Sequence, residues 1–323
     1  MNLFILPMLS VLLFWCAACT ALPFLVLRDR RLARLRKRAI FDKRATQLSG
    51  LCALMSILWG AALCADAYFH GRMDSVASTL SRPLWLIFVG GECLAAVLVL
   101  CSFLAGKRRI PVFVGALLGG CAAVCSYLIF ILLLWSFLRG EALPGNSLLP
   151  SAPGDPFPAE QLIRQMIEWF AAVPVREDWA LSGLALGFFC FLPPVAAYMC
   201  ALLWYLLRRG VDDFGRDYYL FAVGGGARRA AWSGALLLPF AAVLLWVTPP
   251  FAAEVINSLP FGTLKPEQMA LLYNILPLCL PLAVFCCYLP CRFSSPLRGK
   301  SLMVLAPCFL LAGIFVMLVR LWG

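Results

Sequence analysis

Residues 3 to 38 read LFILPMLSVLLFWCAACTALPFLVLRDRRLARLRKR, an uncharged and mostly apolar stretch followed at once by a strongly basic one. A helix needs about 20 apolar residues to cross the ~30 Å hydrocarbon core of a bilayer, and residues 3 to 27 meet that length. The stretch is too long for a signal-peptide core, and no basic residue precedes it. We therefore expect a retained membrane helix with a basic segment at its end.

The same pattern recurs along the chain. Its 323 residues are 63% hydrophobic and 13% charged, whereas soluble domains are about half apolar and about a quarter charged. This composition excludes a secreted disulfide scaffold, a disordered chain and a soluble nucleotide-binding enzyme. It predicts an all-α polytopic membrane protein with eight transmembrane helices, at 3 to 27, 48 to 69, 83 to 106, 111 to 138, 180 to 207, 233 to 255, 271 to 290 and 301 to 321.

The basic residues predict the orientation of these spans. Alternate connecting segments hold 20 of the 27 Lys and Arg residues, and segment 28 to 47 is the richest. Because basic loops remain in the cytoplasm, we expect both termini on the periplasmic side of a bacterial inner membrane. Orientation and attraction to anionic lipid headgroups account for the net charge of +11. We therefore expect the bilayer, and no nucleic acid, as the partner of these charges.

The connecting segments recur in the same order in the second half of the chain, where Arg228 takes the position that Arg44 has before the second span. The recurrence suggests two parallel four-helix bundles, although the charge rule alone also produces part of it. Within the linker between the halves, residues 160 to 170 predict an amphipathic helix on the membrane surface or a docking segment for a partner. The predicted units are 1 to 138, the extracytoplasmic linker 139 to 179, and 180 to 323.

The available ligand residues argue against two classes of redox cofactor in this chain. His70 is its only histidine, whereas a b-type haem in a helix bundle usually takes two axial histidines. Imidazole is also the commonest ligand of zinc and copper centres. The 15 cysteines lie in predicted spans or, for Cys291, at the inner interface, and we interpret them as small packing residues. We expect no haem and no metal in this chain.

Glu92 is the clearest ionisable residue at membrane depth. It lies in the third predicted span, about 13 Å from the outer surface at a rise of 1.5 Å per residue. A charged group at the centre of a membrane helix costs about 2.5 to 3.5 kcal/mol, so its presence suggests a function. Burial favours the neutral form, which makes Glu92 a candidate proton acceptor; a hydrogen bond between helices is the alternative.

His70 lies at the outer end of the second span, one helical turn after Asp66, which could orient its ring. An interface residue in contact with headgroups and water is the alternative for this histidine. Other polar residues lie at comparable outer depths or near mid-span, and together they could line an outer-facing cavity. The candidate ligand contacts are Asp66, Tyr68, Arg72, Tyr127 and Glu254.

His70-Gly71 and Glu92, set in eight spans with both termini outside, resemble the membrane anchors of the polysulfide, nitrite and dimethyl-sulfoxide reductase group, called NrfD-like or DmsC-like. The resemblance implies a haem-free subunit that binds menaquinone or ubiquinone near the outer leaflet. It implies His70 as the hydrogen-bond partner of the quinol and Glu92 as the proton acceptor. In the family the acid typically begins the third span after a Leu-Ser motif, whereas Glu92 lies further along.

Quinol oxidation releases two protons and two electrons. The acid and the histidine could accept the protons, while a docked extracytoplasmic redox protein takes the electrons. We expect a subunit of a respiratory complex, non-catalytic on its own, with the other subunits as partners. A transporter or permease is the first alternative, favoured by the proline-interrupted spans at Pro193-Pro194 and Pro249-Pro250. A ligand-free accessory subunit is the second.

Two more motifs lie on the side of the membrane where the basic connecting segments are predicted. Residues 212 to 219, rich in charges and aromatic rings, predict a short interfacial helix with internal ion pairs, or a contact for a cytoplasmic subunit. Gly224-Gly225-Gly226 lacks the flanking strand and the spaced glycines that phosphate-binding loops need.

Overall fold

The computed structural model describes residues 5–69, 94, 97–101, 104, 121, 124, 179–212, 214–247, 276–293 and 295–322. Within these ranges every regular element is a helix and no strand occurs. The predicted all-α fold is thereby confirmed for this part of the chain. The long helices are α1 (Ile5–Arg36), α2 (Ala39–Phe69), α6 (Trp179–Arg208), α7 (Arg216–Val247), α10 (Cys279–Tyr288) and α11 (Lys300–Trp322). Three short 3-10 helices accompany them: η2 (Leu276–Leu278), η3 (Leu289–Arg292) and η4 (Pro296–Gly299).

Four of the described segments are long and apolar enough to cross a membrane: Ser10–Arg36, Gly187–Arg208, Arg216–Trp246 and Pro296–Leu318. The apolar segment Cys279–Arg292 is shorter. The chain is therefore a membrane-embedded helical protein. The count of eight spans stays a prediction, because most residues of the predicted spans 83 to 106 and 111 to 138 lie outside the described ranges.

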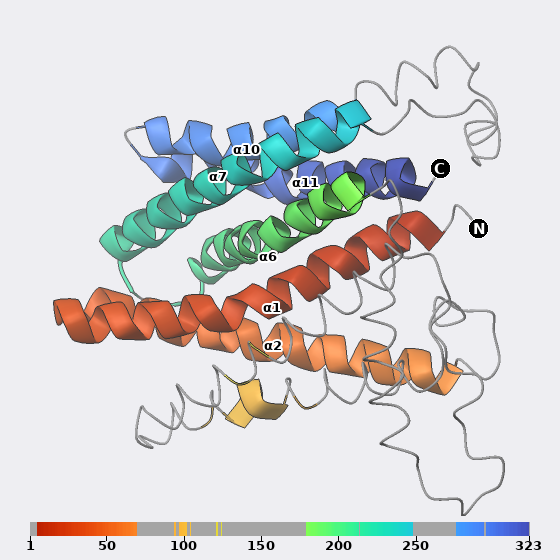
Figure 1. Ribbon diagram of the computed structural model, residues 1–323. Helices are drawn as coiled ribbons and strands as arrows, with labels where there is room; N and C mark the ends of the chain where they lie inside the picture. The colour runs from red at the N-terminus through yellow and green to blue at the C-terminus, as the bar shows by residue number, and fades with distance from the viewer. Residues whose placement is uncertain are drawn as a thin grey trace, which may run out of the picture.

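The described helices form three antiparallel pairs (Figure 1). Helices α1 and α2, α6 and α7, and α10 and α11 each turn back at the same end of the bundle, while the N- and C-termini lie together at the opposite end (Figure 1). The three turns carry Arg and Lys residues, Lys37, Arg209 and Arg298 among them. We call this end of the molecule the basic end.

Two basic segments that connect predicted spans, 28 to 47 and 208 to 232, are mostly helical in the described residues. Helix α1 continues to Arg36 and α2 begins at Ala39, so that the turn between them is only two residues long. Lys37 in this turn has a φ of 48°, the left-handed conformation that commonly ends a helix. Arg, Lys and Ala are good helix formers, so both helices extend beyond their apolar stretches. The predicted helix at 212 to 219 is not a separate short helix, because residues 216 to 219 are the first residues of α7.

The core is built from small side chains on α1, α6 and α7. Ala17, Ala196, Ala227 and Ala230 are fully buried, and small residues of this kind let membrane helices approach closely. Helix α6 packs against both α1 and α7, and α10 packs against α7 and α11. Six of the described cysteines, all predicted as packing residues, are buried in the same core: Cys16, Cys19, Cys52, Cys200, Cys286 and Cys287.

Candidate functional site

Most of the predicted outer site falls outside the described part of the chain. Asp66 and Tyr68 lie in the last turn of α2, where the structure describes the backbone but not their side chains. The remaining predicted site residues lie outside the described ranges: His70, Arg72, Glu92, Tyr127 and Glu254.

The backbone of α2 nevertheless places Asp66 relative to the basic end. The helix runs without interruption from Ala39 to Phe69. Arg44 and Asp66 are therefore separated by about 33 Å along its axis, at 1.5 Å per residue. This distance matches the hydrocarbon thickness of a bilayer. Asp66 thus lies at the end of α2 that is opposite to the basic end.

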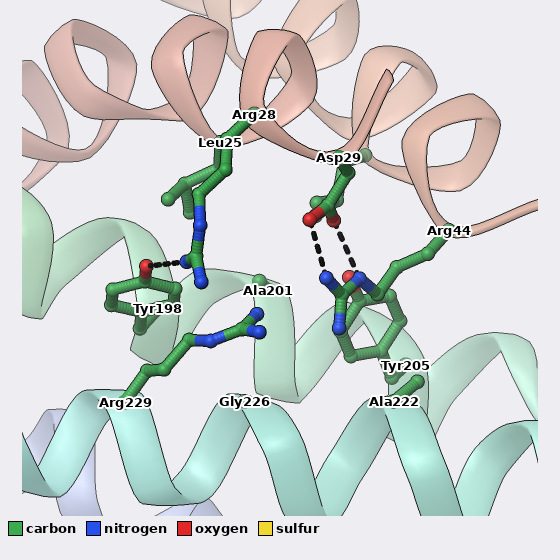
Figure 2. A pocket seen from close by; sticks show the side chains of 11 residues that line it. Leu25, Arg28, Asp29, Arg44, Tyr198, Ala201, Tyr205, Ala222, Gly226 and Arg229 are labelled. Atoms are coloured by element: carbon green, nitrogen blue, oxygen red, sulfur yellow. Dashed lines mark hydrogen bonds and ion pairs between the residues drawn. The ribbon is translucent and has the colours of Figure 1, made fainter. Parts of the chain in front are cut away.

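The best-defined polar site lies at the basic end, where an ion pair is buried between α1 and α2. Both nitrogens at the edge of the Arg44 guanidinium, Nε and Nη2, donate to the two carboxylate oxygens of Asp29 (Figure 2). The side chains are only 2% and 4% exposed. Such a two-point contact fixes orientation as well as charge, so it sets the register of α1 against α2.

Two aromatic rings surround the same guanidinium. The central carbon of Arg44 lies 5.4 Å from the ring centroids of both Phe41 and Phe221, a distance at which a cation is attracted to a ring. Burial alone would lower the pKa of Arg44, but its hydrogen bond to Asp29 and the charge of that carboxylate outweigh burial and raise the pKa. Arg44 therefore stays charged, with its charge neutralised by Asp29.

One turn further along α2, Gln47 joins three helices. Its amide nitrogen donates to Asp212 at 2.6 Å and lies 3.3 Å from the hydroxyl of Tyr219, while its amide oxygen accepts from Tyr218 at 2.6 Å. The indole nitrogen of Trp204 donates to the Gln47 backbone carbonyl at 3.1 Å. Every polar group of the Gln47 amide is thus engaged, which links α2 to α6, to α7 and to the turn between them.

A small cavity adjoins the ion pair between α1, α6 and α7. Its volume is about 10 Å³, close to the minimum that accommodates one water molecule. Arg28 donates to the hydroxyl of Tyr198 at 2.8 Å across this space. Figure 2 shows Arg229 extending from α7 toward the gap between Arg28 and Arg44. Three arginines and a single aspartate, Asp29, line the cavity, so its charge is strongly positive.

The sequence did not predict the buried cluster around Asp29 and Arg44, because the sequence around these residues looks like a solvated basic loop. One signal was present: Asp29 is the single acidic residue within the run 28 to 38, and Arg44 follows it on the next helix. Within the predicted run 212 to 219, Asp212 does form an ion pair. Its partner is Arg208, 3.6 Å away, which lies just before that run rather than inside it. Gly225 of α7 faces the side chain of Arg44 on α2, which indicates a packing role for the glycine triplet.

Comparisons of the chain with protein-family models, with curated proteins and with solved structures find no match.

Proposed function

We propose that this protein is the quinone-interacting membrane anchor of a respiratory oxidoreductase complex, with its quinone site at the end of the bundle opposite to the basic end. Glu92 accepts a proton from the bound quinol, and His70 hydrogen-bonds to the quinol oxygen. The electrons pass to a metal-containing partner subunit on the same side. Support comes from the resemblance of the His70 and Glu92 pattern to NrfD-like and DmsC-like anchors, and from the membrane-embedded helical fold.

The observation that carries the proposal is the unbroken course of α2. This helix joins the buried Arg44, at the basic end, to Asp66 and Tyr68 in its final turn. In the sequence His70 directly follows Phe69, the last residue of α2, and it lies outside the described residues. If the basic end faces the cytoplasm, as the charge distribution indicates, Asp66, Tyr68 and His70 belong to the periplasmic interface. An outer-leaflet quinol site requires that location.

The packing at the basic end supports a quinone site that opens only at the opposite end of the bundle. Arg44, Gln47, Tyr205 and Tyr218 occupy the space between α1, α2, α6 and α7 and are all buried. Proton release to the periplasm needs no route through this end, whereas a transporter must open it. Helix α6 also continues through Pro193-Pro194, so this one of the two proline pairs that favoured a transporter does not break its helix; Pro249-Pro250 lies outside the described residues.

The proposed reaction balances in both protons and electrons. The quinol loses two electrons and two protons; the electrons reduce the partner's metal centre, and the protons leave through Glu92 and His70 to periplasmic water. Arg72, Tyr68, Tyr127 and Glu254 are the proposed ligand contacts. The linker 139 to 179 is the proposed docking segment for the partner.

The test is a titration of the purified full-length complex with a quinone analogue, combined with quinol-linked turnover. Glu92→Gln keeps the size and hydrogen-bonding capacity of the side chain but cannot take up a proton, so turnover should fall by about 10²-fold or more while assembly is retained. His70→Gln should slow the same step less. Asp217→Asn, which changes an exposed acid at the basic end, is the matched control and should leave turnover unchanged.

Wild-type turnover and analogue affinity in Glu92→Gln would contradict the outer quinol site. In that case, solute uptake by proteoliposomes containing the protein would test the transporter alternative. Co-purification of a partner without any effect of quinone analogues would favour the accessory-subunit alternative.

A further inference from the structure

We propose that the cavity at the basic end binds one phosphate-bearing anion, held by Arg28 of α1 and Arg229 of α7. Among the described residues that line this cavity, Asp29 is the only acidic one, and both of its carboxylate oxygens accept from Arg44. Arg28 and Arg229 therefore have no carboxylate partner among the residues that the structure describes. The site is distinct from the proposed quinone site and lies at the other end of the bundle.

The two remaining arginines differ in their contacts. Arg28 donates one hydrogen bond, to the hydroxyl of Tyr198 at 2.8 Å. Within the described ranges, Arg229 makes no hydrogen bond or ion pair with another side chain. It lies close enough to Arg28 and Arg44 to be repelled by both, and its weaker attractions to Tyr198 and Asp29 offset only part of this repulsion. Holding like charges together in a partly buried site costs free energy. A bound anion would turn this repulsion into two attractive contacts.

Shape and exposure favour an anion with a projecting oxygen atom. The cavity of about 10 Å³ has room for roughly one water-sized atom. Arg28 is exposed, whereas Arg229 is half-buried. One oxygen of a phosphate group can therefore enter the cavity beside Arg229 while the others remain next to Arg28 on the open side. Guanidinium groups bind phosphate through parallel N–H···O bonds, so arginine suits this ligand better than lysine.

The position along the helices fits the depth of lipid phosphates. Arg28 directly follows the apolar stretch 3 to 27, and Arg229 lies just before the apolar stretch that starts at 233. Both residues are thus at the predicted boundary between hydrocarbon and headgroups. Basic pockets between membrane helices on the cytoplasmic side are known to bind anionic headgroups. A lipid phosphodiester and free inorganic phosphate share the required chemistry.

The full-length protein is reconstituted in nanodiscs of phosphatidylcholine with a minority of phosphatidylglycerol, and the phosphatidylglycerol that stays bound after detergent extraction is counted by native mass spectrometry. Wild type should retain it, and Arg229→Gln and Arg28→Gln should each lose about tenfold in affinity, the effect of one charge-assisted contact. Arg31→Gln removes the same charge from an exposed position of α1 that does not line the cavity. This control should bind like wild type.

A second arm titrates inorganic phosphate. Displacement of the lipid by millimolar phosphate, together with a calorimetric signal lost in Arg229→Gln, would identify free phosphate as the ligand; no displacement would identify the lipid. If Arg229→Gln does not assemble, the Arg28→Gln variant carries the test, because Arg28 is exposed. Equal retention by wild type and Arg28→Gln, or equal loss in Arg31→Gln and Arg28→Gln, would overturn the proposal.

Discussion

Arg44 and Asp29, fifteen positions apart on adjacent helices, form a two-point ion pair that is almost completely shielded from solvent. The turn between their helices is two residues long, so small slips of α2 along α1 would separate the charges. Taking two charges out of water is costly, and their attraction offsets this cost only in good geometry. The pair therefore selects one register of the α1 and α2 pair rather than simply adding stability.

Asp29→Asn should destabilise the protein by about 3 to 5 kcal/mol, because it leaves the Arg44 charge buried without a counterion. The measurement is reversible unfolding of the purified protein in mixed micelles. Asp42→Asn, at an exposed position of α2, is the matched control and should change the free energy of unfolding by less than about 0.5 kcal/mol.

The double variant Asp29→Leu, Arg44→Met separates the cost of an unpaired charge from the worth of the pair. Apolar replacement of a whole buried ion pair is often neutral or stabilising, so stability should return to within about 1 kcal/mol of wild type. If the double variant is as unstable as Asp29→Asn, the pair contributes through its own attraction and the register argument is wrong.

Gln47→Leu should cost about 1 to 3 kcal/mol, because it leaves the buried Tyr218 hydroxyl without its acceptor and removes the hydrogen bond to the half-buried Asp212. Thr46→Val is the control, since Thr46 is exposed and its hydroxyl donates only to the Asp42 carbonyl of its own helix. The comparison uses the same unfolding assay. A Gln47→Leu variant as stable as the Thr46→Val variant would show that the Gln47 contacts do not join the helices.

Two glycine substitutions should have opposite effects. A Cβ at Gly225 would lie 3.7 Å from Nη1 of Arg44, an ordinary contact, and Ala in a helix interior is favoured over Gly by about 1 kcal/mol. A Cβ at Gly299 would lie 2.7 Å from Cγ and 3.2 Å from Cα of Pro290, a rigid ring that cannot turn aside. Gly225→Ala should raise the melting temperature and Gly299→Ala should lower it. Equal shifts of the same sign would contradict the packing described here.

Much of the architecture could be predicted from the sequence because membrane insertion imposes a simple rule. Uncharged stretches of about 20 residues become helices, since the backbone has no water to bond with in the bilayer. The positions of α1, α6, α7 and α11 follow that rule. The extension of α1 and α2 beyond their apolar stretches does not follow from this rule, because it depends on helix propensity and on the packing of one helix against another.

The buried cluster could not be predicted for a related reason. Hydropathy describes Asp29 and Arg44 as loop residues, and only the close return of α2 along α1 brings them together. The cavity also needs Arg229, whose distance from Arg28 along the chain hides their proximity. For the candidate outer site, by contrast, the sequence alone suggested the chemistry through its residue types. The structure adds no geometry there, because His70 and Glu92 lie outside the described residues. Its geometry therefore stays a prediction.

The topology of the bundle can be tested at the turn between α6 and α7. An epitope inserted after Gly210 should be tolerated, because Gly210 is exposed and a Cβ there would meet no other atom within 4 Å. We expect this epitope to be protected from external protease in spheroplasts, and tags at both termini to be accessible, because basic loops stay in the cytoplasm. Both termini lie at the end of the bundle opposite to this turn (Figure 1).

An epitope at Lys37, in the turn between α1 and α2, should report the same side as the one after Gly210, since both turns lie at the basic end (Figure 1). Accessibility of either epitope from outside would reverse the orientation, place Arg28 and Arg229 at the periplasmic leaflet, and move the proposed quinol site to the cytoplasmic side. Epitopes on opposite sides would contradict the parallel arrangement of the α1–α2 and α6–α7 pairs. Agreement between the two turns, with both termini exposed, would require an even number of spans, as the eight-span prediction does.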